Sequence, residues 1–218
     1  NGIRLVGNRS GVGRCIEAVL RCMGSIDHPF DDIRVYTPAP LGSDVVLPGN
    51  ARNVVLPGAL PMSLWEQFTL RNAHPADAPL FCPSYVIPLT TGSPTLLVHH
   101  GSYEGFPSAF SWWTLNKARA IYSASAHRAT VVTTVSEFSR HDMAKYYRID
   151  PARIHVIPEG VDTGAFRPMR RDQRATEWRK KNVDAERPFV LYVGKPTERR
   201  NLSNLIRAFA LLRREHGI

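Results

Sequence analysis

Short apolar runs alternate with longer amphipathic stretches along the whole chain. The short runs predict strands, because most of them are brief, apolar and bounded by Pro or Gly: Ile33–Thr37, Asn53–Leu56, Leu80–Cys82, Thr95–His99, Thr130–Val135, Ile154–Ile157 and Phe189–Val193. Uninterrupted apolar runs of this length are typical of strands that are buried on both faces of a parallel sheet.

The longer stretches predict helices over Val12–Met23, Met62–Asn72, Ser111–Arg128, Glu137–Tyr147 and Leu202–Glu215. In the last of these, apolar residues recur at the spacing of about 3.6 residues that gives a helix one apolar face: Leu202, Leu205, Ile206, Phe209 and Leu212. Regular alternation of strands and helices predicts an α/β fold with a mostly parallel sheet. The overall composition, 43% hydrophobic and 22% charged, is that of an ordinary globular protein.

A change in composition divides the chain. Residues 1–162 have the pattern of a complete α/β domain, whereas residues 163–187 are polar and basic and predict a connector. Residues 188–218 contain only one predicted strand and one predicted helix, too few to bury a core. We therefore expect them to be the first βα unit of a second domain. Because Asn1-Gly2 leads directly into a glycine loop, we also expect the first strand to be clipped.

The net charge of +9 is unevenly distributed over the 218 residues. Residues 1–109 hold 7 Lys and Arg against 8 Asp and Glu, whereas residues 110–218 hold 21 against 11. A basic half of this kind fits nucleic acid, anionic lipid or a diphosphate ligand. No stretch approaches the roughly 20 apolar residues of a membrane span.

The 3 cysteines are odd in number and match no metal-binding spacing. We interpret them as reduced thiols of an intracellular protein. Cys15 and Cys22 lie on one predicted helix, where we expect both to be small buried residues.

The first candidate motif is the glycine loop Gly7–Arg14, which contains Gly11-Val12-Gly13 and leads into a helix. Glycines allow close backbone approach, and a helix N-terminus attracts anions, but a tight structural turn explains the loop equally well. The spacing also suggests a short-chain dehydrogenase. That alternative lacks the Tyr-x-x-x-Lys pair, and no acidic residue ends Ile33–Thr37 to hold a ribose.

The second motif, His99-His100-Gly101-Ser102, ends an apolar strand, where ligands bind in open α/β sheets. A polar pair there suits sugar contact or proton transfer, although a histidine that is hydrogen-bonded into a loop is the simpler explanation. No third ligand stands at a spacing that would make a metal site. The third motif begins at Ser136-Glu137, and helix capping alone explains both residues.

The fourth motif is the loop Gly194–Asn201, between the last predicted strand and helix. It carries Lys195, Arg199 and Arg200 beside a glycine, which is a plausible clamp for a diphosphate because Arg supplies paired N–H donors and Lys a point charge. A solvated surface loop is the alternative.

In this order and spacing, the four motifs resemble the retaining glycosyltransferases of family four, which have the GT-B fold, and in particular their mannosyltransferase-like branch. The most specific stretches run from Val131 to Arg140 and from Ile154 to Pro168. The segment from Phe189 to Asn201, with the helix that follows it, looks like the opening of the donor-binding domain of that family.

The resemblance implies two Rossmann-like domains: one for a glycan or lipid-linked acceptor and one for a nucleotide-sugar donor. It implies transfer of a hexose, mannose or similar, with retention of configuration and without a metal or other cofactor. Gly11, Val12 and Gly13 would lie near the donor phosphates, and His99 would be the catalytic histidine near the transferred sugar. Lys195, Arg199 and Arg200 would hold the diphosphate.

Three departures accompany this likeness. His100 replaces the usual Asp, and Arg199-Arg200-Asn201 replaces the usual Arg-Lys-Asn. The paired-glutamate motif of the family would lie beyond residue 218, so we expect residues 1–218 alone to be inactive. We expect the parent protein to be cytoplasmic, in peripheral contact with the inner face of the membrane.

The alternative to an enzyme is a non-catalytic module whose basic region, residues 167–214, binds anionic lipid or nucleic acid. That region has few interleaved aromatics besides Trp178 and lacks a nucleic-acid fold signature, so nucleic acid is not expected.

Overall fold

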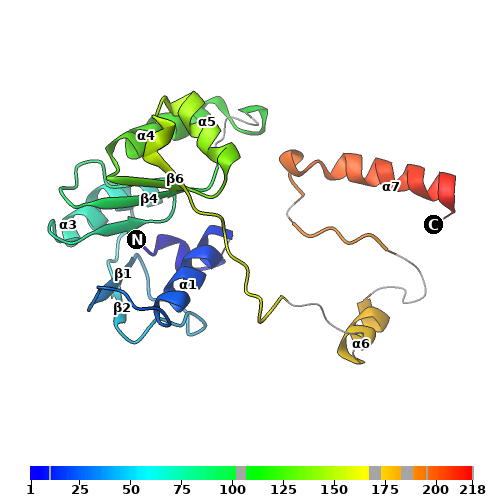
Figure 1. Cartoon of the computed structure of the whole chain (residues 1–218), viewed down its shortest axis with the longest axis horizontal. Coiled ribbons are helices and arrows are strands. Elements are labelled where there is room, and N and C mark those ends of the chain that lie inside the picture. The colour runs from blue at the N-terminus through cyan, green and yellow to red at the C-terminus, as the bar shows by residue number, and fades with distance from the viewer. Residues whose placement is uncertain (10, 102–106, 167–172, 183–188, 195, 218) are drawn as a thin grey trace. The chain divides into compact units, whose positions relative to one another are not determined.

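The computed structural model describes residues 1–9, 11–101, 107–166, 173–182, 189–194 and 196–217. The chain divides into two compact units, Asn1–Glu159 and Gly160–Ile218, which are described separately. Figure 1 shows the elements of both.

All strand pairs of the first unit are parallel. β1 (Ile33–Thr37) pairs with β2 (Ala51–Val55), and Ile33 lies opposite Ala51. A second sheet has the order β3-β4-β5-β6, formed by Leu80–Cys82, Thr95–His99, Val131–Thr134 and Ile154–Val156. The predicted α/β class with parallel strands is therefore confirmed.

The N-terminal residues join the two sheets. The Gly2 amide donates to the carbonyl of Tyr36 in β1 (2.9 Å), and the terminal amine of Asn1 donates to the carbonyl of Phe81 in β3 (2.8 Å). The order across the unit is therefore β2, β1, the N-terminal segment, β3, β4, β5 and β6. The chain winds in one direction through β1 and β2 and in the other through β3 to β6, as in a doubly wound fold.

Helices cover these strands. α1 (Gly11–Met23) follows the glycine loop, while α4 (Trp112–Arg128) and α5 (Glu137–Tyr147) lie next to each other over the four-stranded sheet (Figure 1). One further helical run consists of α2 (Met62–Leu64), the π-helical η2 (Trp65–Leu70) and α3 (Arg71–Ala73). The described residues of this unit also form three short 3-10 turns: η1 (Ile3–Leu5), η3 (Pro107–Ala109) and η4 (Pro151–Arg153).

Two apolar clusters form the core of this unit. The larger one gathers Trp65, Leu97, Val132 and Met143 from the helical run, the sheet and α5. The smaller one packs Ile16 and Leu20 of α1 against Val35 of β1. Apolar strand positions therefore anchor both sheets, as their sequence pattern predicts.

Several predicted boundaries shift for local reasons. β5 starts at Val131 because Thr130 and Thr95 instead exchange bonds between backbone amides and side-chain hydroxyls (3.0 and 3.2 Å). β2 starts earlier than predicted, at Ala51, because an edge strand tolerates polar Arg52 and Asn53. Cys22 is exposed and Cys15 half-buried, so the expectation that both are buried was wrong.

The second unit contains α6 (Gln173–Asn182), the 3-10 turn η5 (Glu198–Arg200) and α7 (Leu202–His216). The predicted strand Phe189–Val193 does not form. A strand needs a partner for its backbone groups, and the described residues of this unit include no other strand. α6 was not predicted, because good helix-forming residues build it without an apolar face.

No helix in the described part of the chain is long and apolar enough to cross a membrane.

Candidate functional site

The site of the first unit lies where the winding direction of the sheet reverses. This switch point is the N-terminal segment between β1 and β3, and ligands of open α/β sheets bind beyond the carboxyl ends of strands at such a point. Arg4 spans it, because its Nε donates to Oγ of Ser84, just after β3 (3.1 Å). The glycine loop and the ends of β3, β4 and β6 therefore surround one edge of the sheet.

The three predicted donor-binding residues of the glycine loop have different environments. Gly11 starts α1, is exposed, and has no atom within 4 Å of the position that a Cβ would occupy. Val12 is half-buried against the smaller apolar cluster. A Cβ on Gly13 would lie 2.4 Å from the carbonyl oxygen of Arg4, so Gly13 lets α1 pack on the N-terminal segment. Only Gly11 is open to a ligand.

His99, the predicted catalytic residue, is fully buried at the end of β4. Its ring packs edge-on against Tyr85, Tyr122 and Tyr147, with centroids 4.9, 5.8 and 5.4 Å away. Neither ring nitrogen has a hydrogen-bond partner among the described residues. Burial, together with a smaller effect of the neighbouring His100, lowers the pKa of His99 to about 3, so the ring is neutral near pH 7.

His100 occupies the edge itself and connects three strand ends. Its Nε2 is 2.8 Å from the carbonyl of Pro83, after β3, and its Nδ1 is 3.4 Å from Oε1 of Glu159, after β6. The negative charge of Glu159 also acts on Cys15 in α1. The pKa of the Cys15 thiol is raised mainly by burial and, in addition, by this charge. The loops after β3, β4 and β6 and helix α1 therefore meet here.

Tyr85 shows an unusual backbone conformation at this edge. Its φ of 67° lies in the left-handed region, which a bulky side chain seldom adopts. Its ring stacks on Tyr122 (5.0 Å) and lies edge-on to both histidines. Backbone strain of this kind concentrates at functional sites. Sequence reasoning missed Tyr85 as a site residue, although its place just after a strand could have indicated it.

Sequence reasoning also missed the titration of Glu66. This carboxyl is buried in η2, and Nδ2 of Asn1 donates to it (2.6 Å). Burial raises its pKa to about 7, although the Asn1 bond and the charge of Arg4 act in the opposite direction. A carboxyl that titrates near neutrality beneath the N-terminal segment is a functional-site signal, although structural networks produce it as well.

The second unit holds the predicted diphosphate clamp. Gly194 has a φ of 150°, and a Cβ there would lie 3.0 Å from Nη1 of Arg200, so the guanidinium folds back over the glycine. Arg200 is exposed and closes the turn η5, with its amide donating to the carbonyl of Thr197 (2.9 Å). Lys195 and the side chain of Arg199 lie outside the described residues.

Within the described ranges, no group of three His, Cys, Asp or Glu side chains has the arrangement of a metal site. The polar groups at the sheet edge include backbone amides, the Ser84 hydroxyl, the imidazoles of His99 and His100, the Arg4 guanidinium and the Glu159 carboxylate. These groups suit hydrogen bonding to a polyhydroxy or phosphate ligand.

Comparison of the sequence with known protein families identifies the family of this chain. The sequence model of Glycosyltransferase Family 4 matches residues 10–165, a span that includes α1, the four-stranded sheet and both histidines. The chain belongs to glycosyltransferase family 4. The resemblance to glycosyltransferase family 4 that the sequence motifs indicated is therefore confirmed.

Relatives with curated names agree with the family 4 assignment. Alpha-maltose-1-phosphate synthase of Mycolicibacterium smegmatis is 32% identical over 81 residues, which are 37% of this chain and 21% of the relative. GDP-mannose-dependent alpha-(1-6)-phosphatidylinositol monomannoside mannosyltransferase of Mycobacterium tuberculosis is 31% identical over 140 residues, 64% of this chain and 34% of the relative. The matched part of this family 4 chain therefore spans at most about a third of these relatives.

Proposed function

We propose that this chain is part of a longer glycosyltransferase with the GT-B fold, which transfers a hexose from a nucleotide-sugar to a glycan or lipid-linked acceptor with retention of configuration. The family match over the first unit carries the proposal. The mannosyltransferase relative favours mannose from a GDP carrier and a lipid-linked acceptor. We place the enzyme in the cytoplasm, in peripheral contact with the inner face of the membrane.

The chemical requirement of the donor side is stabilisation of the leaving nucleoside diphosphate. Lys195, Arg199 and Arg200 supply cations, and the exposed N-terminus of α1 at Gly11 supplies amide donors and the positive end of a helix dipole. Preorganised charge of this kind usually dominates such catalysis, and we propose that these groups take the place of a metal ion.

The role that we propose for His99 follows from its environment. A neutral imidazole with a pKa of about 3 cannot supply a proton near pH 7, but it can exchange hydrogen bonds with a sugar hydroxyl. Two buried nitrogens without partners among the described residues cost free energy, and functional sites are one place where that cost is tolerated. We therefore propose that His99 orients the transferred sugar.

Calorimetric titration of the full-length gene product with GDP-mannose and other nucleotide-sugars tests the donor site. Arg200→Gln should weaken donor binding by about tenfold to a hundredfold, because it removes a charge-assisted hydrogen bond. Arg207→Gln, an exposed arginine of α7, is the matched control and should leave binding unchanged. Equal effects of the two substitutions, or a requirement for a divalent metal, would contradict the proposal.

A further inference from the structure

Tyr85 occupies a strained turn at the carboxyl edge of the four-stranded sheet. The Val86 amide donates to the carbonyl of Ser84 (2.9 Å), which closes a three-residue turn around Tyr85, whose φ is 67°. A turn of this kind with a positive φ at its centre is the rare and strained form of the γ-turn. Of the described residues other than glycine, two more have a positive φ, and both of them, Arg148 and Asn201, end a helical element. A helix end does not explain the conformation of Tyr85.

Hydrogen bonds to three separate elements hold this turn in place. The Tyr85 amide donates to the carbonyl of Val98 in β4 (3.1 Å). Two residues further on, the Ile87 amide donates to Oγ of Ser125 in α4 (3.3 Å), and the Ile87 carbonyl accepts from Nε2 of Gln67 in η2 (2.8 Å). The turn cannot relax to an ordinary conformation without disturbing these bonds. Strained residues that the surrounding structure maintains in this way cluster at functional sites.

The turn places the Tyr85 ring against both histidines of the site. Its centroid lies 4.9 Å from that of His99 and 5.7 Å from that of His100, and the ring stacks on Tyr122 at 5.0 Å. His99 is fully buried, and neither of its ring nitrogens has a hydrogen-bond partner among the described residues. Within that part of the chain, ring contacts rather than polar bonds therefore set the rotation of the His99 ring. Edge-on aromatic pairs have a preferred geometry, which suits them to this task.

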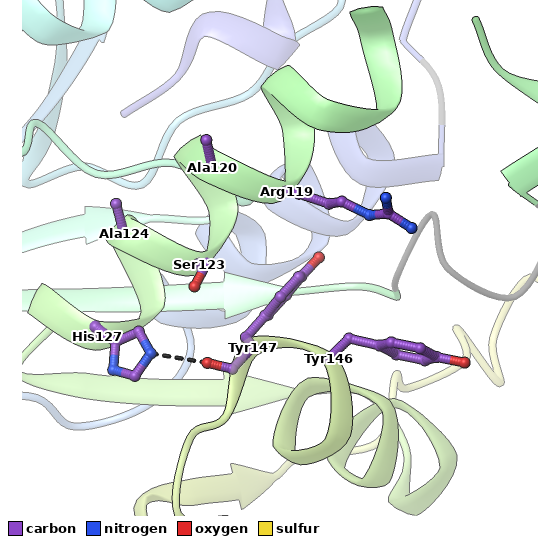
Figure 2. A pocket seen from close by; sticks show the side chains of 7 residues that line it. All are labelled: Arg119, Ala120, Ser123, Ala124, His127, Tyr146 and Tyr147. Carbon is purple, nitrogen blue, oxygen red and sulfur yellow. Dashed lines mark hydrogen bonds between the residues drawn. The ribbon is translucent and has the colours of Figure 1, made fainter. Parts of the chain in front are cut away.

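Two further tyrosine rings around His99 are held by helices. Tyr122 belongs to α4, and Tyr147 is the last residue of α5. Nε2 of His127 in α4 donates to the backbone carbonyl of Tyr147 (2.8 Å), which ties the two helices together beside a groove of about 590 Å³ (Figure 2). Helix packing therefore fixes these two rings, whereas the place of the Tyr85 ring depends on the strained turn.

We propose that Tyr85 is a positioning residue, which holds the ring of His99 in the orientation that meets the transferred sugar. The inference rests on the proposed function, because it assigns the role of Tyr85 through the role of His99. A ring that rotates freely presents its nitrogens to the sugar for only part of the time, and a small misplacement of an orienting group costs about a hundredfold in rate. Tyr85 therefore acts on turnover and not on binding of the donor diphosphate.

Steady-state kinetics of the full-length gene product test this role with paired substitutions. Tyr85→Leu keeps the apolar bulk but lacks the flat ring, so kcat should fall by about tenfold to a hundredfold while KM for the nucleotide-sugar changes by less than about twofold. Tyr85→Phe keeps the ring and should retain kcat within about threefold. Tyr146→Leu, at an exposed tyrosine of α5, is the matched control and should leave both constants unchanged. Tyr85→Asn should act as Tyr85→Leu does and tolerates a positive φ, so it replaces the leucine variant if that variant does not fold.

A titration that needs no sugar transfer separates this inference from the proposed function. NMR of the same protein with labelled histidine follows the ring signals of His99 against pH, and His99→Phe identifies those signals. In the wild type and in Tyr85→Phe, the ring should stay neutral down to about pH 4. In Tyr85→Leu it should protonate at a higher pH, closer to its ordinary pKa of 6.5, because water reaches the freed ring.

The possible results of the two measurements differ in what they contradict. A wild-type protein that transfers no sugar would contradict the proposed function, and the titration would then still decide whether Tyr85 fixes the His99 ring. Three results would overturn the inference about Tyr85: full activity of Tyr85→Leu, a loss in Tyr85→Phe or Tyr146→Leu as large as that in Tyr85→Leu, or a His99 titration that Tyr85→Leu leaves unchanged.

Discussion

At the scale of single residues, His99 carries the clearest physical signal. Its ring is buried among three tyrosines, and its folded-state pKa of about 3 is far below its ordinary value of 6.5. Between these values the unfolded chain binds a proton that the folded chain does not. This residue therefore stabilises the fold above about pH 6.5, and its contribution is lost as the pH falls toward 3.

His99→Phe should remove this pH dependence while keeping the ring contacts. Relative to the variant, the wild type should lose about 2 kcal/mol of unfolding free energy between pH 7 and pH 5. Urea unfolding at several pH values measures the difference. Parallel loss of stability in the two proteins would show that His99 is not buried in the neutral form.

The glycine loop gives a second residue-scale prediction. Gly13→Ala should lower the unfolding free energy by about 1–3 kcal/mol, because its Cβ would collide with the Arg4 carbonyl. Gly11→Ala is the matched control, since the space around it is open, and should leave stability unchanged or raise it by up to about 1 kcal/mol. Thermal unfolding of both variants and the wild type measures the change in stability. Equal destabilisation would mean that α1 does not pack on the N-terminal segment.

At the scale of elements, the π-helical stretch η2 positions the chain that follows β3. Nε2 of Gln67 donates to the carbonyl of Ile87 (2.8 Å), and the Leu89 amide donates to its Oε1 (2.8 Å). One amide side chain therefore satisfies two backbone groups of the segment that follows Tyr85. In this way η2 fixes a loop of the candidate site.

Gln67→Met should lower the unfolding free energy by about 2–4 kcal/mol, because two backbone groups lose their partners while the side-chain volume is kept. Arg71→Met, an exposed change in the same helical run, should cost less than about 0.5 kcal/mol. Chemical denaturation of both variants measures their unfolding free energies. A small effect at Gln67 would show that water replaces the amide without loss.

The elements also show how far sequence reasoning reaches. Strands Ile33–Thr37, Leu80–Cys82 and Thr95–His99 were predicted with their bounds, because most of their residues are apolar and buried or half-buried. The N-cap at Ser136 was predicted too, and its Oγ accepts from the Ser139 amide (3.1 Å). A capping residue and the apolar pattern of a strand are local features, so both can be predicted from the sequence.

Other features depend on contacts between distant segments. Phe189–Val193 reads as a strand, yet a strand forms only with a partner. α6 has no apolar face to indicate it. The burial of His99 depends on Tyr122 and Tyr147, which come from two later helices. The left-handed conformation of Tyr85 likewise has no signature in the letters Ser84-Tyr85-Val86. Tertiary contacts decide the strand, the burial of His99 and the conformation of Tyr85, whereas α6 was missed because it lacks the apolar periodicity that indicates a helix.

At the scale of the whole molecule, the account depends on a donor domain larger than the described part of residues 160–218. The apolar face of α7 shows the need: Leu205, Ile206 and Leu212 are all exposed. In the proposed enzyme, further parts of the donor domain cover that face. The gene is therefore expected to encode about 150 residues after Ile218, the length that completes a typical domain. Two glutamates should follow a glycine-rich turn there.

The central claim is that the parent protein transfers a hexose from a nucleotide-sugar with retention. The most direct measurement is to incubate its full-length gene product with GDP-mannose and related donors, with a lipid-linked or glycan acceptor. NMR then reads the anomeric configuration of the new bond. The account predicts an α-linked product from an α-linked donor and no transfer by residues 1–218 alone. Inversion of configuration, robust transfer by the 218-residue chain, or no transfer from any nucleotide-sugar would contradict it.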